Sequence, residues 1–199
     1  GKTIYASALG DPTNFYVYDG VSTDSYAVAV GTEGEFTGCI AYSSTVLFWK
    51  ENCLHKVLGS YPAQYEIYTY TVPGIQKGSE KSLAVINETL FYKGRNGVYA
   101  YSGGTPELLT ENFGTRRFFD AVGGTDGERY YISMRTEKGD WELYVFDTLR
   151  ATALEAAPSA GTTADAGGLR TALLRARGTE QEFLVNRLCL RAMPQARYQ

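Results

Sequence analysis

Two stretches of this chain repeat one pattern of residues. Residues 46–62, VLFWKENCLHKVLGSYP, and residues 89–106, TLFYKGRNGVYAYSGGTP, each set an apolar and aromatic run on both sides of a short polar turn. The Leu-Phe-Trp-Lys run that begins at Leu47 returns as Leu-Phe-Tyr-Lys from Leu90, 43 residues later, whereas the glycine and proline beyond the turn return 44 residues later. Insertions are tolerated best in turns. We therefore predict a repeated two-strand unit whose one-residue difference in length lies in the turn.

A third copy extends the pattern. Residues 129–147, RYYISMRTEKGDWELYVFD, carry two strand-like runs around a longer polar loop. Further strand-like segments flank the copies, namely CIAYS at 39, SLAVIN at 82, FFDAVG at 118 and YEIYTYTV at 65, and the opening stretch offers two more, around Ile4 and at residues 15–18. The pattern predicts units of three or four antiparallel strands. The residues expected at equivalent positions of successive units are Leu47, Phe48, Leu90, Phe91, Tyr131 and Ile132.

The turn of the second copy contains Asn96 and Gly97. Both residue types tolerate a positive φ, which a two-residue type I′ hairpin turn requires at both of its positions. The sequence therefore predicts a type I′ turn here. It also predicts that valine at position 97 would be destabilising, because a β-branched residue resists positive φ.

A repeat of about 40–44 residues built from short antiparallel strands is typical of the blades of a β-propeller. The chain is therefore expected to be all-β. An ordinary β-sandwich also has short strands and frequent turns, but it gives no reason for the same run to return one blade length later. A closed propeller needs about four to eight blades, and residues 1–150 supply about three and a half. We expect a partial propeller, either a portion of a larger one or one that closes with other subunits.

The composition agrees with an all-β chain and narrows the function. Sixteen Tyr, nine Phe and 22 Gly favour pleated surfaces and frequent turns. A net charge of −3 argues against nonspecific binding to nucleic acid, since that binding requires a basic surface. No apolar run is long enough to cross a membrane. The three cysteines, Cys39, Cys53 and Cys189, have no metal-ligand spacing, and their odd number favours reduced, buried thiols and folding in a reducing cell interior.

Few residues offer catalytic chemistry. His55 is the only histidine, which excludes sites that need several, and its place in a hairpin strand favours a surface or lateral packing role. Cys53 lies two residues away and suggests a Cys-His dyad, but no third group is evident that would orient the imidazole. Arg116 and Arg117 precede two phenylalanines and are expected to pack by their stems. We expect no catalytic residue, no cofactor site and no metal site.

The segment after Arg150 has a different composition. Residues 151–199 hold eleven Ala and six Arg but no Lys, and one of the sixteen Tyr. One interpretation is an appendage that is helical or disordered over residues 168–190 and packs little against the strands. The other is translation of a shifted reading frame, which the coding DNA would decide. The expected division is a propeller-like portion at 1–150 and an atypical tail at 151–199.

Several phrases of the sequence resemble a group of virion proteins from tailed phages and prophages of Gram-positive gut bacteria. These phrases are GDPTNFYVYDGVSTDSYAV, GEFTGCIAY, VLFWKENCLHKVLGSYP, QKGSEKSLAVINETLFYKGRNGVYAYSGG and YYISM, and they span residues 1 to about 148. The group is similar in layout to propeller proteins of the phage neck and tail hub, including packaged-DNA stabilisation proteins. The resemblance implies a non-enzymatic structural component of the virion, with portal, neck or tail proteins as partners and homo-oligomerisation as a further option.

Two other functions stay open. A carbohydrate-binding or carbohydrate-cleaving propeller would use exposed Tyr and the two Trp as platforms for sugar rings. An intracellular scaffold propeller would bind peptides on one of its faces. Neither alternative is tied to a motif in this chain, since the repeated box of the sialidases is not found.

Overall fold

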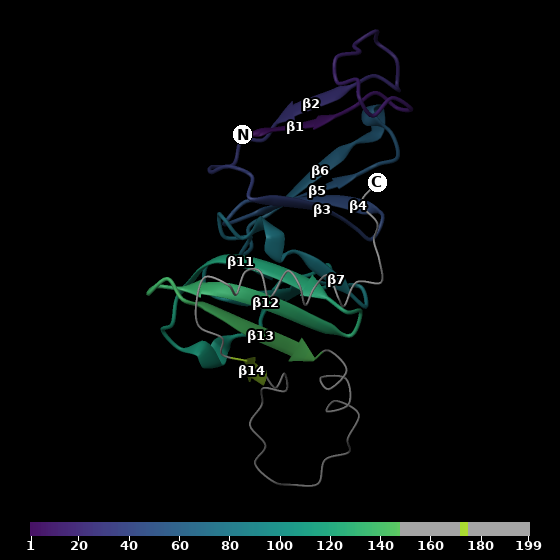
Figure 1. Cartoon of the computed structure of the whole chain (residues 1–199). Helices are drawn as coiled ribbons and strands as arrows, with labels where there is room; N and C mark the ends of the chain where they lie inside the picture. Colours follow the sequence, from purple (N-terminus) through teal and green to yellow (C-terminus); the bar gives the residue numbers. More distant parts are fainter. Residues whose placement is uncertain (148–171, 175–199) are drawn as a thin grey trace. The chain divides into compact units, whose positions relative to one another are not determined.

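The computed structural model describes residues 1–147 and 172–174. In this part of the chain the regular elements are β-strands and single turns of 3₁₀-helix, and none is an α-helix. The strands form four separate antiparallel sheets, as Figure 1 shows. The expectation of an all-β chain is confirmed, and the four sheets of the described residues do not form a closed ring.

One sheet has two strands and the other three have four. The two-stranded sheet holds β1 (Thr3–Ala6) and β2 (Tyr26–Ala29). The second sheet holds β3 (Gly38–Tyr42), β4 (Thr45–Trp49), β5 (Leu54–Leu58) and β6 (Glu66–Tyr70). The third holds β7 (Ala84–Ile86), β8 (Thr89–Lys93), β9 (Val98–Tyr101) and β10 (Glu107–Leu108). The fourth holds β11 (Phe118–Thr125), β12 (Arg129–Thr136), β13 (Trp141–Asp147) and β14 (Ala172–Leu174). The 3₁₀ turns are η1 (Pro62–Gln64), η2 (Glu80–Ser82) and η3 (Glu111–Phe113).

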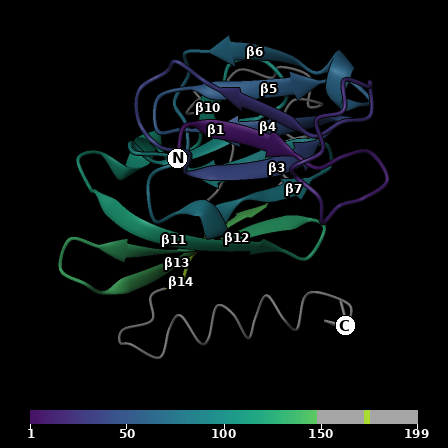
Figure 2. The same ribbon diagram turned by 90° about the horizontal axis from the view of Figure 1, so that it is seen from above.

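Each four-stranded sheet is a simple meander. In all three, every strand pairs with the strand that follows it in the sequence, so the spatial order is the sequence order. Figure 2 shows this for β11, β12 and β13, which run side by side. The three repeated hairpins of the sequence occupy the second and third strands of these sheets, as predicted.

The chain divides into two compact units, Gly1–Ile75 and a second that begins at Gln76. The first contains the two-stranded sheet and the sheet β3–β6. Its buried core includes Leu47, Trp49, Leu54 and Ile75, each at most 1% exposed. Tyr26 of β2 meets Tyr65, just before β6, edge to face with ring centroids 5.4 Å apart. The two sheets of this unit are therefore joined by packing as well as by the chain.

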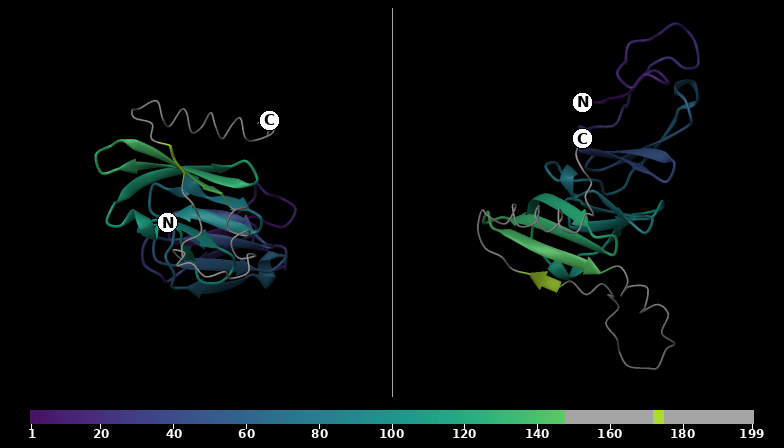
Figure 3. Two further views of the ribbon diagram at one scale, coloured as in Figure 1. Left: turned by 90° about the horizontal axis from the view of Figure 1, so that it is seen from below. Right: turned by 45° about the vertical axis from the view of Figure 1, so that its right-hand side comes forward.

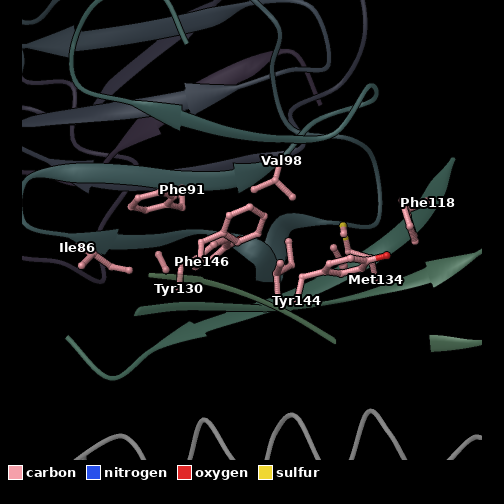
Figure 4. Close-up of a cluster of buried hydrophobic side chains, with 11 residues drawn as sticks. Ile86, Phe91, Val98, Phe118, Tyr130, Met134, Tyr144 and Phe146 are labelled. Carbon is pink, nitrogen blue, oxygen red and sulfur yellow. The ribbon is translucent and has the colours of Figure 1, made fainter. Parts of the chain in front are cut away.

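The second unit buries its core between two sheets. Figure 4 shows side chains of the sheet β7–β10 and of the sheet β11–β14 meeting in one apolar cluster. Tyr130 of β12 is fully buried and stacks on Phe91 of β8, with ring centroids 5.2 Å apart. Its hydroxyl donates a hydrogen bond of 2.5 Å to the carbonyl oxygen of Ser82. Burial of aromatic rings from both sheets is the main apolar contribution to this unit.

Two hairpin turns set the register of the repeat. Ser43 and Ser44 connect β3 to β4, and Asn87 and Glu88 connect β7 to β8, all four with φ between 42° and 63°. Both residues of a type I′ turn have positive φ of this size, so these two connections are type I′ turns. Because β4 and β8 both begin directly after a two-residue turn, Thr45 corresponds to Thr89, a separation of 44 residues.

The alignment of Leu47 with Leu90 is therefore wrong by one residue. Counted from the turn, Leu47 occupies the position of Phe91. The loops that follow β4 and β8 both have four residues, so the predicted one-residue difference in the length of this turn is not present. A shift by one exchanges the two faces of a strand. The repeated letters nevertheless look aligned because β8 is buried on both faces and accepts large apolar residues at successive positions. Tyr131 and Ile132 lie on β12, the second strand of its sheet, as expected.

The predicted type I′ turn at Asn96 and Gly97 is not formed. Asn96 is not among the residues with positive φ, and the loop spans residues 94–97, closed by a hydrogen bond of 2.8 Å from Gly94 N to Gly97 O. Glycine is required at position 97 for a different reason. A Cβ there would lie 2.0 Å from the Thr110 hydroxyl oxygen, which accepts a hydrogen bond from the amide of Val98.

We expect Gly97→Ala to lower the free energy of unfolding by roughly 2 kcal/mol, because the methyl group displaces the Thr110 side chain and breaks its bond to Val98. Chemical denaturation of the variant measures this. Gly103→Ala is the control for glycine entropy and positive φ, since Gly103 also has positive φ but has open space around its Cβ position. Equal losses for the two variants would contradict the steric explanation.

Two further expectations are corrected. Residues 15–18 form no strand, and β1 instead pairs with β2, with Ile4 opposite Val28. The tail was expected to be helical or disordered over residues 168–190, but Ala172–Leu174 form β14, which pairs with β13 and completes the fourth sheet. Figure 3 shows this short strand in yellow at the edge of β13. The remaining residues of that prediction, and the expected boundary at 150/151, lie outside the described residues.

Candidate interaction surface

His55 is a buried structural residue. Its side chain is fully buried on β5, so a surface position is wrong. Nδ1 lies 2.8 Å from the Thr69 hydroxyl and Nε2 lies 2.8 Å from the Thr32 hydroxyl. Burial, together with the charge of Lys50, lowers the pKa of His55, which favours the neutral imidazole. The ring thus links β5, β6 and the segment before β3.

Cys53 lies close to this imidazole, with Sγ 3.7 Å from Nε2. The sequence offered no third group to orient the ring, but the structure provides one in Thr69. The thiol is buried, as is the imidazole. Since a nucleophile must reach its substrate, the pair has the contacts of a dyad without the access, and its hydrogen bonds serve packing.

Arg116 pairs with a partner that the sequence did not reveal. Its Nη2 lies 2.7 Å and 2.6 Å from the two carboxylate oxygens of Glu142, and its Nη1 donates to the Tyr144 hydroxyl at 3.1 Å. The guanidinium lies 5.0 Å from the centre of the Phe118 ring, so the charged head of Arg116, and not only its stem as expected, lies against an aromatic ring. The hydrogen bond to Glu142 raises the pKa of Arg116. The cluster joins β13 to the start of β11 and is a stabilising contact.

Two lysines are buried at the ends of the repeated strands. Lys50 and Lys93 are each 1% exposed. The Lys50 ammonium donates to the carbonyl oxygen of Thr32 at 2.7 Å and lies 5.1 Å from the centre of the Phe36 ring. The Lys93 ammonium donates to Gln76 Oε1 at 2.8 Å and to the carbonyl oxygen of Gly94. Burial lowers the pKa of Lys93 to about 8.

The remaining chemical features of the described residues are few. No group of three or more His, Cys, Asp or Glu in this part of the chain is placed to hold a metal ion. None of its helices is long and apolar enough to cross a membrane. Trp49 is fully buried, so its proposed use as a platform for sugar rings is wrong.

Five of the exposed large apolar side chains of the described residues lie in the connection between β1 and β2. We call residues 7–25 the aromatic loop. Tyr16 is 86% exposed, the largest value among the exposed large apolar residues of the described part. The other exposed large apolar residues of the loop are Leu9, Phe15, Tyr18 and Val21. Tyr5, on the adjoining strand β1, is 59% exposed and extends the surface.

The aromatic loop is held by its own hydrogen bonds. The buried Ser25 hydroxyl accepts from the amide of Val17 at 3.1 Å and donates to the carbonyl oxygen of Asn14 at 3.2 Å. Asp24 accepts from the amides of Gly20 and Val21. Asp11 and Asn14 accept amide hydrogen bonds in the same way. Compact loops closed by local bonds are often binding elements, because their exposed side chains are already ordered.

β1 has an unpaired edge. The two-stranded sheet has no third strand in the described part of the chain. The amide of Val30 donates to the carbonyl oxygen of Lys2 at 2.9 Å. Because hydrogen-bonded and non-hydrogen-bonded pairs alternate along an antiparallel ladder, the next hydrogen-bonded pair is Ile4 with Val28. The amides and carbonyls of Thr3 and Tyr5 therefore turn away from β2. They form a row of backbone groups that a further strand could pair with. At the start of this edge the carbonyl oxygen of Gly1 already accepts a hydrogen bond of 3.4 Å from the amide of Phe36.

This surface is acidic as well as aromatic. Residues 3–49 contain five acidic residues and no Lys or Arg. Three of the five, Asp11, Asp19 and Asp24, lie in the aromatic loop.

The sequence pointed to this loop through its Gly-Asp-Pro-Thr-Asn stretch, whose Asp and Asn side chains bond to the backbone as such residues do in turns. The run of aromatic residues at 15–18 predicts a strand, whereas in the structure it belongs to this exposed loop.

Comparison with known proteins adds no relative. A scan against protein-family models finds no matching family, and a search of curated proteins finds no match.

Proposed function

We propose that the protein is a non-enzymatic structural component of a tailed-phage or prophage virion, acting in the neck or tail hub. The proposal joins the resemblance of residues 1 to about 148 to such proteins with one observation of the fold. Three meander sheets of the same strand order are accompanied by a two-stranded sheet with an open edge and an exposed aromatic loop. A protein whose sheets end in an unpaired edge gains stability from partners that cover it.

The finer fold we propose is a partial β-propeller. Blades of a propeller are four-stranded antiparallel meanders whose spatial order follows the sequence. The sheets β3–β6, β7–β10 and β11–β14 have this order, and the last two share one apolar core within their unit. The sheet β1–β2 would be an incomplete fourth blade. Portal, neck and tail proteins are the proposed partners, the virion is the proposed location, and self-association is a second way to cover the open edge.

The test is the protein content of purified phage particles. We expect mass spectrometry to find this chain in particles at a fixed ratio to the portal protein, and pull-down with the tagged chain to recover portal or tail proteins. Particles from a deletion strain, complemented in trans, are the control. Absence of the chain from particles would contradict the proposal.

A carbohydrate-binding role is the second candidate, and the exposed tyrosines of the aromatic loop favour it. Tyrosine rings can stack on sugars as Trp does, although Trp49 is unavailable. A glycan array with the full chain separates the two functions. Specific glycan binding that is lost in Tyr16→Ala, together with absence from particles, would favour this candidate.

A further inference from the structure

The two strands β1 and β2 occupy the third and fourth places of a sheet. In the complete sheets, the first and second strands are joined by two or three residues and the second and third by four. The third and fourth strands are joined by longer segments, such as residues 59–65 between β5 and β6. β1 and β2 are joined by the aromatic loop, which is longer than any of the short connections. In length, the connection between β1 and β2 therefore resembles the connections between the third and fourth strands of the complete sheets.

Burial agrees with this placement. The third strand β5 is mostly buried and the fourth strand β6 is mostly exposed. β1 likewise holds the buried Ile4, whereas β2 has no buried residue. In a complete sheet the third strand pairs with the second on the side away from the fourth. The edge of β1 that carries the Thr3 and Tyr5 backbone groups is the position where a second strand would lie.

We propose that this edge binds a β-hairpin of a partner protein, whose inner strand pairs antiparallel with β1 and whose flanks are basic. Two strands are required because no strand of the described residues fills the first or the second place of this sheet. A second copy of this chain is the poorer occupant, because every described strand of its complete sheets is already paired in sequence order. The basic character follows from Asp11, Asp19 and Asp24 of the aromatic loop, which holds no Lys or Arg.

The aromatic loop supplies the side-chain contacts of this site. Tyr16 and Tyr18 present exposed rings from a loop that its own hydrogen bonds hold in place. Arginine and lysine bind the faces of such rings as well as carboxylates. The hydrogen bonds of the added strand would give affinity, and the acidic aromatic loop would select a basic partner over an acidic one.

The inference rests on the assembly role proposed above, and its test is independent of virions. We would join a designed hairpin to Gly1 through a flexible Gly-Ser linker of about eight residues, which keeps its effective concentration high. One version carries four Lys or Arg residues at the ends of its strands, and the other carries four Glu residues at the same positions. Backbone hydrogen exchange of the full chain reports whether the edge is occupied.

We expect the basic hairpin to slow exchange at the Thr3 and Tyr5 amides by about tenfold or more, and the acidic hairpin to leave them unchanged. Thr3→Pro removes a donor from the open edge of β1 and should abolish the remaining protection at Tyr5. Ala29→Pro is the matched control, because the amide of Ala29, which lies opposite Thr3, turns to the far edge of β2. This variant should keep the protection.

Equal protection by both hairpins would overturn the selection by charge, and no protection by either would overturn the edge site. These outcomes come from the unsubstituted chain, so they do not depend on whether a proline variant folds. Formation of dimers through the β1 edge, seen by sedimentation and removed by Thr3→Pro, would replace the partner hairpin with a second copy.

If the basic hairpin binds but the chain is absent from particles, the virion role fails and the site stands. If the chain is in particles but neither hairpin protects Thr3, the site fails and the role stands.

Discussion

Replacing Tyr130 with alanine is expected to lower the free energy of unfolding by about 4 kcal/mol. The ring is fully buried between two sheets of the second unit and stacks on Phe91. Removing a buried aromatic side chain costs about 3–5 kcal/mol, because both the transfer of the ring from water and the packing around it are lost. The carbonyl of Ser82 also loses the hydroxyl that donates to it. Urea denaturation followed by fluorescence and by circular dichroism measures the loss.

Tyr130→Phe separates the ring from the hydroxyl. This variant keeps the stack on Phe91 and removes the hydroxyl that donates to Ser82, so its expected loss is about 1–2 kcal/mol. A loss in Tyr130→Ala no larger than in Tyr130→Phe would mean that the two sheets do not depend on this ring for their packing.

The second large effect is a pH dependence carried by Lys93. Burial lowers its pKa in the folded protein to about 8, from 10.5 in the unfolded chain. Between these values the unfolded state binds more protons than the folded state, so stability rises with pH across this window. Below pH 8 both states are protonated and the buried charge costs its full amount. The wild type should therefore gain roughly 3 kcal/mol relative to Lys93→Met between pH 8 and pH 10.5.

The measurement is the difference in unfolding free energy between the wild type and Lys93→Met at several pH values. Titration of the many tyrosines contributes to both proteins and is removed by the subtraction. Lys81→Met, which removes an exposed ammonium, is the matched control for losing one positive charge. A flat difference for Lys93→Met, or the same slope for both variants, would show that Lys93 titrates as a solvated lysine.

The sequence was sufficient for the strands of the repeated units because their signal is local. Alternating and aromatic runs at residues 39, 65, 82 and 118 all became strands, as did the three hairpins. The alignment of equivalent residues between the units was harder to predict, since it depends on which residues form the turns. Ser43 with Ser44 and Asn87 with Glu88 adopt positive φ without any glycine, whereas Asn96 and Gly97, the better sequence match, do not form that turn. Strand pairing selects the turn here and overrides the local preference.

The surface of the first unit could be predicted only in part. The five acidic residues of residues 3–49 are visible in the sequence, but the exposure of Tyr16 depends on a loop that folds on itself through Ser25 and Asp24. The aromatic run at residues 15–18 has the composition of a β-strand, and nothing in the local sequence distinguishes a buried tyrosine from an exposed one. The partners of His55 and Arg116 were equally hidden, because Thr32, Thr69 and Glu142 are distant in the sequence.

The sequential order of the strands bears on how this chain is made. In the sheets β3–β6 and β7–β10 a strand finds its partner within the next few residues, so pairing closes only short loops. Local pairing of this kind keeps contact order low and favours fast folding of each sheet. During synthesis the sheet β3–β6 would be complete once Tyr70 has left the ribosome, before the strands of the second unit exist. The protein is thus suited to fold one sheet at a time, which limits the period in which its aromatic strands are open to aggregation.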